Sequence, residues 1–322
     1  MTSWKGDSSL QYAKRGHAML EVEALTKRFG TSAVVDGISF SVGSKEVVGL
    51  VGPNGAGKST TMKIICALLR PNSGSVMIDG ISLSKNGRRD YLMRLGALIE
   101  SPAFYPGLNG RDHLAYLTRL RGRSSNSLIA DTLARVGLDA ASTKPVRKYS
   151  TGMKQRLGIA MAILHKPKLL VLDEPTNGLD PAAIIAMRKL ISQLAEDGTA
   201  VLVSSHLLSE IERVCNRVVF IKEGRVVRNE RVQQEASSIV KMLLRSSNPE
   251  RAREVLAKEE FVLDLEPSEE GLMCTVPIQS VSQIGAVLVH SGLDILELSP
   301  KRSNLEHAYV SEYGTGMEEG LK

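Results

Sequence analysis

Short apolar runs alternate with helical periodicities over the first part of the chain. Residues 46–51 and 168–172 are short, apolar runs of the kind that form buried strands. Helical apolar spacing follows in residues 61–69, and again within residues 149–160, which open with small residues. The alternation predicts an α/β domain with parallel strands.

Beyond Val227 the order of the predicted elements changes. The periodic segments there follow the order βαββαβ, which predicts a small α+β domain of ferredoxin-like topology. A final helix is expected over residues 304–313. The predicted strands are 240–245, 261–265, 272–276 and 295–299, and the predicted helices are 249–257 and 281–290.

The length of 322 residues suits one large domain and one small domain. The first residues are polar and lack the apolar centre of a signal peptide. We therefore expect a disordered N-terminal extension over residues 1–18, the large domain over 19–230 and the small domain over 231–322. No apolar run is long enough to cross a bilayer, which predicts a soluble or peripheral protein.

Composition narrows the choice of partners and compartment. The net charge of +6 comes without an aromatic-interleaved basic patch or a recognised nucleic-acid module, so no nucleic-acid partner is expected. Cys66, Cys215 and Cys274 lack the spacing of metal ligands. They suit a reducing cytoplasm, and neither a zinc site nor a disulfide is predicted.

A glycine-rich loop joins the strand at 46–51 to the helix that follows it. Its glycines let the backbone N–H groups point inward at the positive end of a helix dipole, which favours phosphate. Lys58 is placed to reach the terminal phosphates, and Ser59 or Thr60 to bind Mg²⁺. A plain glycine-rich turn is the alternative, but the strand and helix context favours a nucleoside triphosphate. The predicted contacts are Gly52, Asn54, Gly55, Gly57, Lys58, Ser59 and Thr60.

Two acidic residues follow the apolar run at 168–172. At the carboxyl end of a parallel strand, Asp173 can hold Mg²⁺ through water, and Glu174 can polarise the water that attacks the γ-phosphate. Adjacent acids at a strand end are commonly solvated caps. The phosphate loop upstream favours the catalytic interpretation.

A second anion site is predicted at the start of the helix within residues 149–160. Ser150 can cap this helix, and the N–H groups around Gly152 are available to an anion. One nucleotide hardly needs two such sites within the same chain.

These segments together resemble the ATP-binding cassette (ABC) ATPases over about residues 20–228. The resemblance implies a P-loop NTPase fold with a mostly parallel sheet, an antiparallel β subdomain and a helical subdomain. It places His206 at the switch histidine and Phe29 where the family stacks an aromatic ring on adenine. Alone, His206 would be a capping or surface histidine, and Phe29 a core residue. The matching motifs are Walker A (52–60), the signature (149–160), Walker B (169–174) and the D-loop, which ends at Asp180.

Two positions depart from the usual family pattern. The signature has Thr151 and Met153 where glycine and glutamine are commonest, and Glu100 stands where most relatives carry the glutamine of the Q-loop. A carboxylate there remains an oxygen ligand for Mg²⁺ but adds negative charge beside the triphosphate. We expect Glu100 to alter hydrolysis or membrane coupling. Both departures resemble bacterial cassettes of bacitracin-type and drug resistance and of lantibiotic immunity.

The resemblance implies an ATPase that uses ATP and Mg²⁺ and works with an integral membrane permease of the ABC-2 type. Residues 109–135 would dock on that permease, at the cytoplasmic face of the cell membrane. Lys58 and Ser59 of one subunit and Ser150 and Gly152 of another would enclose each ATP, in a homodimer or a heterodimer with a similar cassette. Export of a drug, peptide antibiotic or lipid-like compound is expected.

Two other classes of function were weighed against export. One is a soluble ABC ATPase that acts on the ribosome or nucleic acid, but the inserted coiled coils, zinc modules or tandem cassettes of such proteins are missing. The other is a nucleotide-dependent binding module without turnover. Retention of Lys58, Asp173, Glu174 and His206 argues against it.

Overall fold

The computed structural model describes residues 18–84, 87–100, 102–122, 125–139, 141, 143–205, 207–232, 239–268, 270–300 and 313. The chain divides into two compact units, with the sequence boundary between Val232 and Gln233. Within the described residues, no helix is both long enough and apolar enough to cross a membrane. The disordered extension expected over residues 1–18 lies outside the described residues except for Ala18, which begins a strand.

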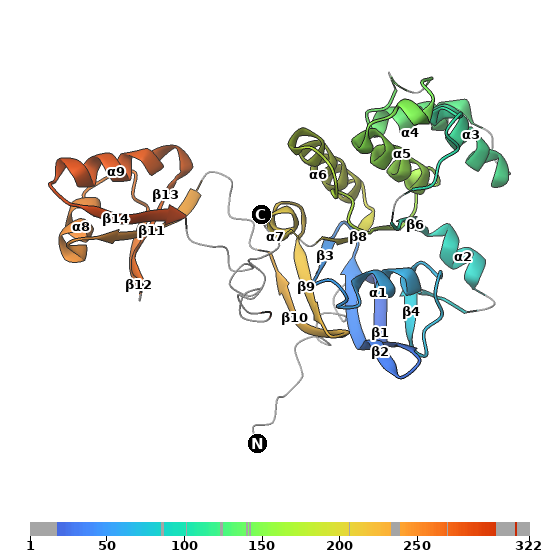
Figure 1. The fold of residues 1–322 in the computed structure, drawn as a ribbon, viewed down its shortest axis with the longest axis horizontal. Helices are drawn as coiled ribbons and strands as arrows, with labels where there is room; N and C mark the ends of the chain where they lie inside the picture. The colour runs from blue at the N-terminus through green and yellow to red at the C-terminus, as the bar shows by residue number, and fades with distance from the viewer. Residues whose placement is uncertain are drawn as a thin grey trace. The chain divides into compact units, whose positions relative to one another are not determined.

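A six-stranded sheet forms the centre of the first unit (Figure 1). The pairs β3–β8, β3–β9, β6–β7 and β7–β8 are parallel, and β9 and β10 form an antiparallel pair. Strands β3, β7 and β8 are buried along their whole length, which explains their continuous apolar sequence. In sheet order the strands are β10 (Arg225–Arg231), β9 (Arg217–Lys222), β3 (Val47–Val51), β8 (Ala200–Ser204), β7 (Leu169–Leu172) and β6 (Leu95–Leu98).

An antiparallel sheet packs on one side of the central sheet. One apolar cluster joins its side chains to those of α1 (Lys58–Ile65) and of β3, β7, β8 and β9. The phosphate loop and α1 are therefore held between two sheets. In order, the antiparallel strands are β2 (Ser32–Gly43), β1 (Ala18–Phe29), β4 (Ser73–Ile78) and β5 (Ile81–Ser82).

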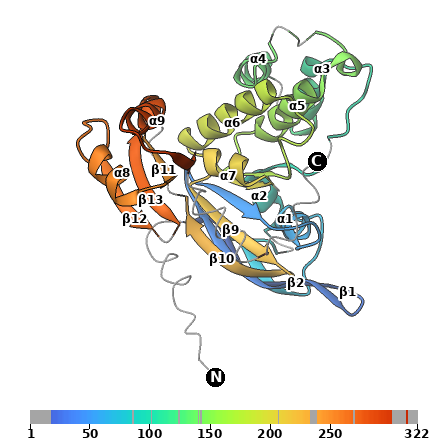
Figure 2. The same ribbon diagram turned by 60° about the vertical axis from the view of Figure 1, so that its left-hand side comes forward.

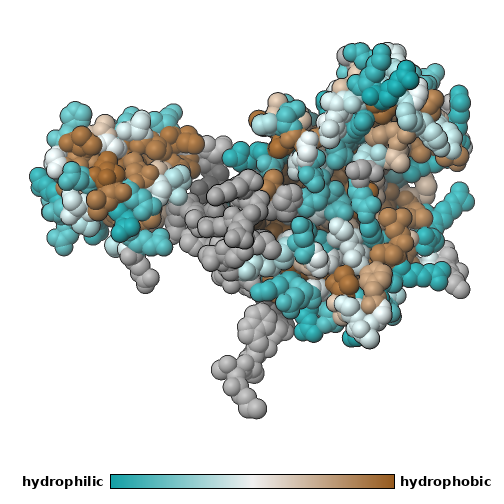
Figure 3. Space-filling view, in the orientation of Figure 1, coloured by the Kyte–Doolittle hydropathy of each residue, from teal (hydrophilic) through white to brown (hydrophobic). Residues whose placement is uncertain are grey.

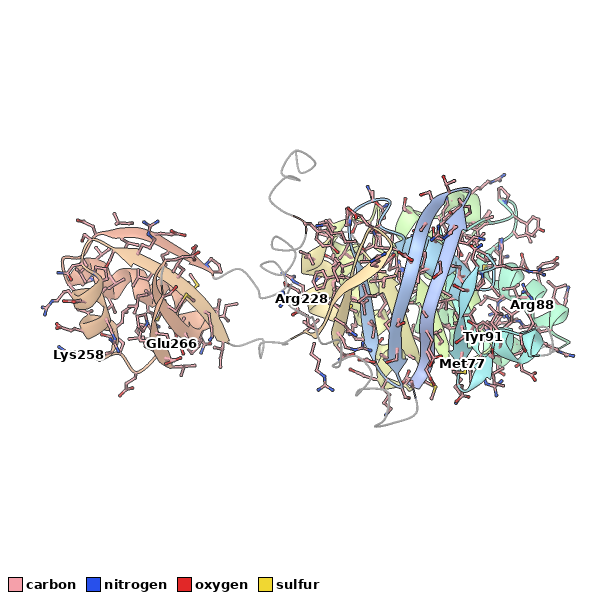
Figure 4. All side chains as sticks on the ribbon, turned by 90° about the horizontal axis from the view of Figure 1, so that it is seen from below. Met77, Arg88, Tyr91, Arg228, Lys258 and Glu266 are labelled. Carbon is pink, nitrogen blue, oxygen red and sulfur yellow. The ribbon has the colours of Figure 1, made fainter. Side chains whose placement is uncertain are left out.

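Two short helices pack against the strands of the first unit. Helix α7 (Leu208–Val214) packs on β3, where a Cβ on Gly49 would lie 2.8 Å from Ile211. Helix α2 (Arg88–Met93) is anchored by Tyr91, which is fully buried and donates its hydroxyl to the Ile65 carbonyl at 2.6 Å (Figure 4). This bond ties α2 to the end of α1.

A helical subdomain contains α3 (Gly110–Leu120), α4 (Asn126–Arg135) and α5 (Thr151–Ile163), which contact one another and lie together in both views (Figures 1 and 2). Asn109 and Asp112 form a capping box at the start of α3. The helix α6 (Pro181–Glu196) begins at Asp180. The helical subdomain implied by the resemblance is present.

The second unit has the predicted βαββαβ order and an antiparallel sheet in the order β12-β13-β11-β14, which is the ferredoxin-like arrangement. Its core lies between this sheet and its helices. Hydrophobic residues also show on its surface in Figure 3, and Leu296 is among the exposed ones. The elements are β11 (Ile239–Ser246), α8 (Pro249–Leu256), β12 (Asp264–Ser268), β13 (Gly271–Pro277), α9 (Val281–His290) and β14 (Ile295–Pro300).

One predicted strand of the second unit is displaced along the sequence. The prediction was 261–265, whereas β12 spans Asp264–Ser268. Phe261 and Val262 are apolar because they pack on the core before the strand begins, and so they do not mark a strand. The helix expected over 304–313 lies outside the described residues, apart from Tyr313.

Candidate functional site

The phosphate loop connects β3 to α1 and depends on two glycines. Gly57 has φ +104°, and a Cβ there would lie 2.5 Å from the Val34 carbonyl oxygen. A Cβ on Gly52 would lie 2.2 Å from the Ile221 carbonyl oxygen. Larger residues would therefore collide with the backbone on which the loop rests. Of the other predicted contacts, Asn54 and Gly55 are exposed and Thr60 is half-buried.

Lys58 folds back over the loop that precedes it. Its Nζ donates to the carbonyl oxygens of Gly52 at 2.6 Å and Pro53 at 3.0 Å, and the residue is only 7% exposed. Burial lowers the pKa of Lys58, while the charges of Glu174 and Asp173 act in the opposite direction. An ammonium group held by carbonyl oxygens in this way can exchange them for phosphate oxygens.

Asp173 lies at the end of β7 and receives two hydroxyl groups on one oxygen. Its Oδ1 accepts from Ser204 at 2.6 Å and from Ser59 at 3.3 Å. The Ser204 hydroxyl also accepts the backbone N–H of Glu174 at 2.9 Å. Asp173 is 6% exposed and Ser204 is fully buried. The sequence analysis missed Ser204, which ends β8, the strand beside β7; the only signal was its place at a strand end.

Glu100 and Glu174 occupy equivalent places on neighbouring strands. Leu98 pairs with Leu172 in the parallel pair β6–β7, so each glutamate lies two residues beyond its strand. Both have left-handed backbones, with φ +60° at Glu100 and +48° at Glu174. A conformation so unusual for non-glycine residues turns the chain sharply at the sheet edge.

The Glu100 carboxylate is paired with a lysine that the sequence analysis did not single out. Nζ of Lys63 lies 2.6 Å from Oε1 of Glu100, and the two side chains are 32% and 67% exposed. Lys63 belongs to α1, one turn beyond Ser59. The structure thus ties Glu100 to α1, the helix that carries the predicted Mg²⁺ ligand Ser59, through an ion pair with Lys63.

The residues present fit a magnesium ion. Ser59 and Asp173 already bring a hydroxyl and a carboxylate oxygen together, and Mg²⁺ is commonly held by one or two protein oxygens, with water and substrate phosphates completing its shell. Within the described residues, His, Cys, Asp and Glu side chains form no group of three that could hold a metal by themselves.

The signature segment and the D-loop residue each begin a helix. Ser150 caps α5 by accepting the Met153 N–H at 3.3 Å, as predicted. Asp180 caps α6 by accepting the Ala183 N–H at 2.8 Å. The two starts are in contact, because a Cβ on Gly152 would lie 3.2 Å from the Ala183 Cβ. Helices α5 and α1 are apart in both views, so the two helices predicted to hold anions are separate within one chain (Figures 1 and 2).

Phe29 is not a core residue. It ends β1 and is 49% exposed, which excludes the alternative that Phe29 is an ordinary residue of the hydrophobic core. Nζ of Lys27 lies 5.2 Å from the centre of the Phe29 ring and donates to the Arg70 carbonyl at 2.8 Å. The predicted switch residue His206 lies outside the described residues.

A partly buried ion pair links the helices that follow the D-loop and the switch position. Arg188 of α6 donates from Nε and Nη2 to Glu210 of α7 at 2.8 and 2.7 Å, and the side chains are 18% and 12% exposed. The pair lines a small cavity together with Ser204 and Ser205. The sequence offered no signal for this contact.

Comparisons with known proteins agree with this geometry. A family model described as ABC transporter matches residues 35–177. The bacitracin transport ATP-binding protein BcrA of Bacillus licheniformis is 35% identical over 301 residues, 92% of this chain and 98% of that protein. The lantibiotic transport ATP-binding protein SrtF of Streptococcus pyogenes is 41% identical over 209 residues, 65% of this chain and 89% of that protein.

A solved structure has the same fold. The ATP binding subunit of an ABC transporter is 33% identical and superimposes with a TM-score of 0.60, over 66% of this chain and 90% of that chain. The similarity to BcrA continues beyond the part that such a subunit covers. A relative of this identity along almost the whole chain shows the family: the protein belongs to the ATP-binding subunits of ABC transporters, which hydrolyse ATP to power transport.

Proposed function

We propose that this subunit binds Mg-ATP between two copies of the chain and drives an ABC-2 type permease that exports a drug, peptide antibiotic or lipid-like compound. One observation carries the proposal most directly. The Ser59 hydroxyl of the phosphate loop lies 3.3 Å from Oδ1 of Asp173, which brings the loop and the strand-end acids into one site. This is the arrangement that phosphoryl transfer with a bound magnesium ion requires.

Within one chain, the phosphate loop would hold the triphosphate. Its inward N–H groups and Lys58 would bind the β- and γ-phosphates, and Ser59 and Asp173 would hold Mg²⁺, Asp173 through water. When bound, the ion neutralises charge on the phosphates. Phe29 would stack its exposed ring on adenine.

Glu174 is the proposed catalytic base. Its backbone N–H is held by Ser204, which orients the residue at the sheet edge next to Asp173. A carboxylate there can accept a proton from water that attacks the γ-phosphate. His206 is proposed to contact the γ-phosphate as the switch residue.

The second half of each site would come from another copy. Ser150 and Gly152 lie at the start of α5, which is apart from α1 in Figure 1, and Asp180 caps the start of α6. Two chains arranged head to tail would place these helix starts over each other's ATP. A homodimer is proposed because one chain carries every motif; a heterodimer with a similar cassette would use the same contacts.

Transport is favoured over a soluble ABC ATPase that acts on the ribosome or nucleic acid, because the relatives are transport subunits. Export, the permease type and a location at the cytoplasmic face of the cell membrane are proposals supported by the same relatives. The helical subdomain, with α3 and α4, is the proposed docking region.

The decisive experiment uses Glu174→Gln to stop hydrolysis with ATP bound. With Mg-ATP this variant should elute as a dimer and retain about two ATP per dimer, and it should co-purify with a multi-span membrane protein from gently solubilised host membranes. Lys58→Ala is the matched control and should stay monomeric. A Glu174→Gln protein that remains monomeric, or that captures ribosomal proteins without a membrane protein, contradicts the proposal.

A further inference from the structure

Glu100 brings an additional negative charge to the nucleotide site. It lies two residues beyond β6, as Glu174 lies two residues beyond the adjacent strand β7. The Asp173 N–H also donates to the Leu98 carbonyl at 2.9 Å, which ties the two strand ends together. The chain positions of Asp173, Glu174 and Glu100 therefore lie at one edge of the sheet.

This edge is also where the triphosphate would bind. Like charges at close range oppose one another, so an unneutralised carboxylate at position 100 would weaken the binding of ATP. Lys58 is not available to Glu100, because its Nζ donates to the carbonyl oxygens of the phosphate loop and is already subject to the charges of Asp173 and Glu174. A further cation is needed to balance Glu100.

Lys63 supplies that cation from the helix that holds the phosphates. It lies four residues after Ser59, which places both side chains on the same side of α1. Its Nζ contacts Oε1 of Glu100 at 2.6 Å. The ion pair spans 37 residues of sequence and connects α1 to the segment that leads from β6 to the helical subdomain.

We propose that Lys63 is a positioning residue that holds the Glu100 carboxylate and cancels its charge, so that this chain accepts ATP beside a glutamate. The Lys63–Glu100 pair carries no net charge, as is true of the glutamine that most relatives carry at position 100. The inference rests on the proposed function, since it concerns the same nucleotide site. It predicts that the effect of Lys63 on ATP binding depends on the charge at position 100.

A purely structural role for Lys63 makes a different prediction. Lys63 lies in the last turn of α1, where a positive charge stabilises the helix dipole whatever residue occupies position 100. Removing Lys63 would then have the same effect beside Glu100 and beside a glutamine. A double-mutant cycle separates the two roles.

The cycle compares the wild type with Lys63→Met, Glu100→Gln and the double variant, in the full chain. The probe is a fluorescent ATP analogue, titrated in EDTA so that the result does not depend on magnesium or turnover, at low and high salt. Lys63→Met should weaken binding about threefold to tenfold when Glu100 is present, and by less than about twofold when it is glutamine. High salt should shrink the difference, and Lys63→Arg should keep most of the affinity.

Two controls make the outcomes distinguishable. Lys45→Met removes an exposed lysine in the turn before β3, at the opposite end of that strand from the phosphate loop, and should leave binding unchanged. Lys58→Ala should abolish it. Failure of the wild type to bind the analogue would overturn the proposed function. Binding that Lys63→Met reduces equally in both backgrounds, or in neither, would overturn the role of Lys63 alone.

Discussion

The Ser204 hydroxyl donates to Oδ1 of Asp173 at 2.6 Å and, through the same oxygen, accepts the N–H of Glu174. One buried hydroxyl thus orients both strand-end acids. It comes from β8, the strand that leads to the switch position. The side chain proposed to hold Mg²⁺ and the backbone of the proposed base therefore depend on the neighbouring strand.

Replacing Ser204 by alanine should lower kcat for ATP hydrolysis by about tenfold. The change removes a hydrogen bond to a carboxylate, which is worth about 1.5–3 kcal/mol, and leaves the Glu174 N–H without that acceptor. Steady-state ATPase assays measure the effect. Ser205→Ala is the matched control, since Ser205 bonds only to Leu207 within the described residues, and it should stay within about twofold. An unchanged kcat in Ser204→Ala would show that Asp173 needs no such support.

Gly57→Ala should destabilise the protein and abolish ATP binding. The added Cβ meets the Val34 carbonyl oxygen in a left-handed conformation, at a strain of about 1–3 kcal/mol or more. Gly55→Ala provides the comparison, because φ is +81° there but nothing lies within 4 Å of the added Cβ. Thermal unfolding should show a larger loss for Gly57→Ala. Equal melting temperatures of the two variants would mean that the backbone at Val34 moves away from the added Cβ without a cost in stability.

Breaking the Arg188–Glu210 pair should cost about 3 kcal/mol of unfolding free energy. Removing one partner leaves the other charge largely buried, since the side chains are only 18% and 12% exposed. Arg188→Met and Glu210→Leu should each show this loss in urea unfolding followed by circular dichroism. The double variant should lose less than the sum of the two. Additive losses would indicate that the residues act independently.

His165 should make the first unit less stable in mild acid. Burial, together with the charge of Arg121, lowers its pKa to about 4, and its Nδ1 is a buried atom with no hydrogen-bond partner among the described residues. In the unfolded chain this side chain has a pKa near 6.5, so it binds a proton more readily than in the folded protein. The contribution of His165 to the free energy of unfolding is therefore fully present above about pH 6.5 and is lost as the pH falls towards 4. His165→Gln should flatten the pH dependence of the melting temperature over this range.

The control for this pH dependence is His290→Gln, which replaces an exposed histidine on α9. It should leave the profile of the first unit as in the wild type. If His165→Gln and the wild type lose stability in parallel between pH 6.5 and 4, another group carries the acid sensitivity.

Local patterns determined much of the fold and of the site. The phosphate loop, the acids after β7 and the helix cap at Ser150 are encoded by residues adjacent in sequence, so spacing and residue type were enough to predict them. The βαββαβ order of the second unit followed from periodicity in the same way. The displaced strand β12 shows the limit, since apolar residues that pack before a strand resemble the strand itself.

Only the tertiary structure decided which charged and hydroxyl groups meet. Ser204 reaches Asp173 across 31 residues, Lys63 reaches Glu100 across 37, and Arg188 reaches Glu210 across 22. Each contact depends on the order of parallel strands or on how helices pack over them. Neither the strand order nor the helix packing can be predicted from the residues that flank one partner. The sequence by itself determined that the chain carries the motifs of a nucleotide-binding site. The order of the strands decided which side chains support the residues of that site.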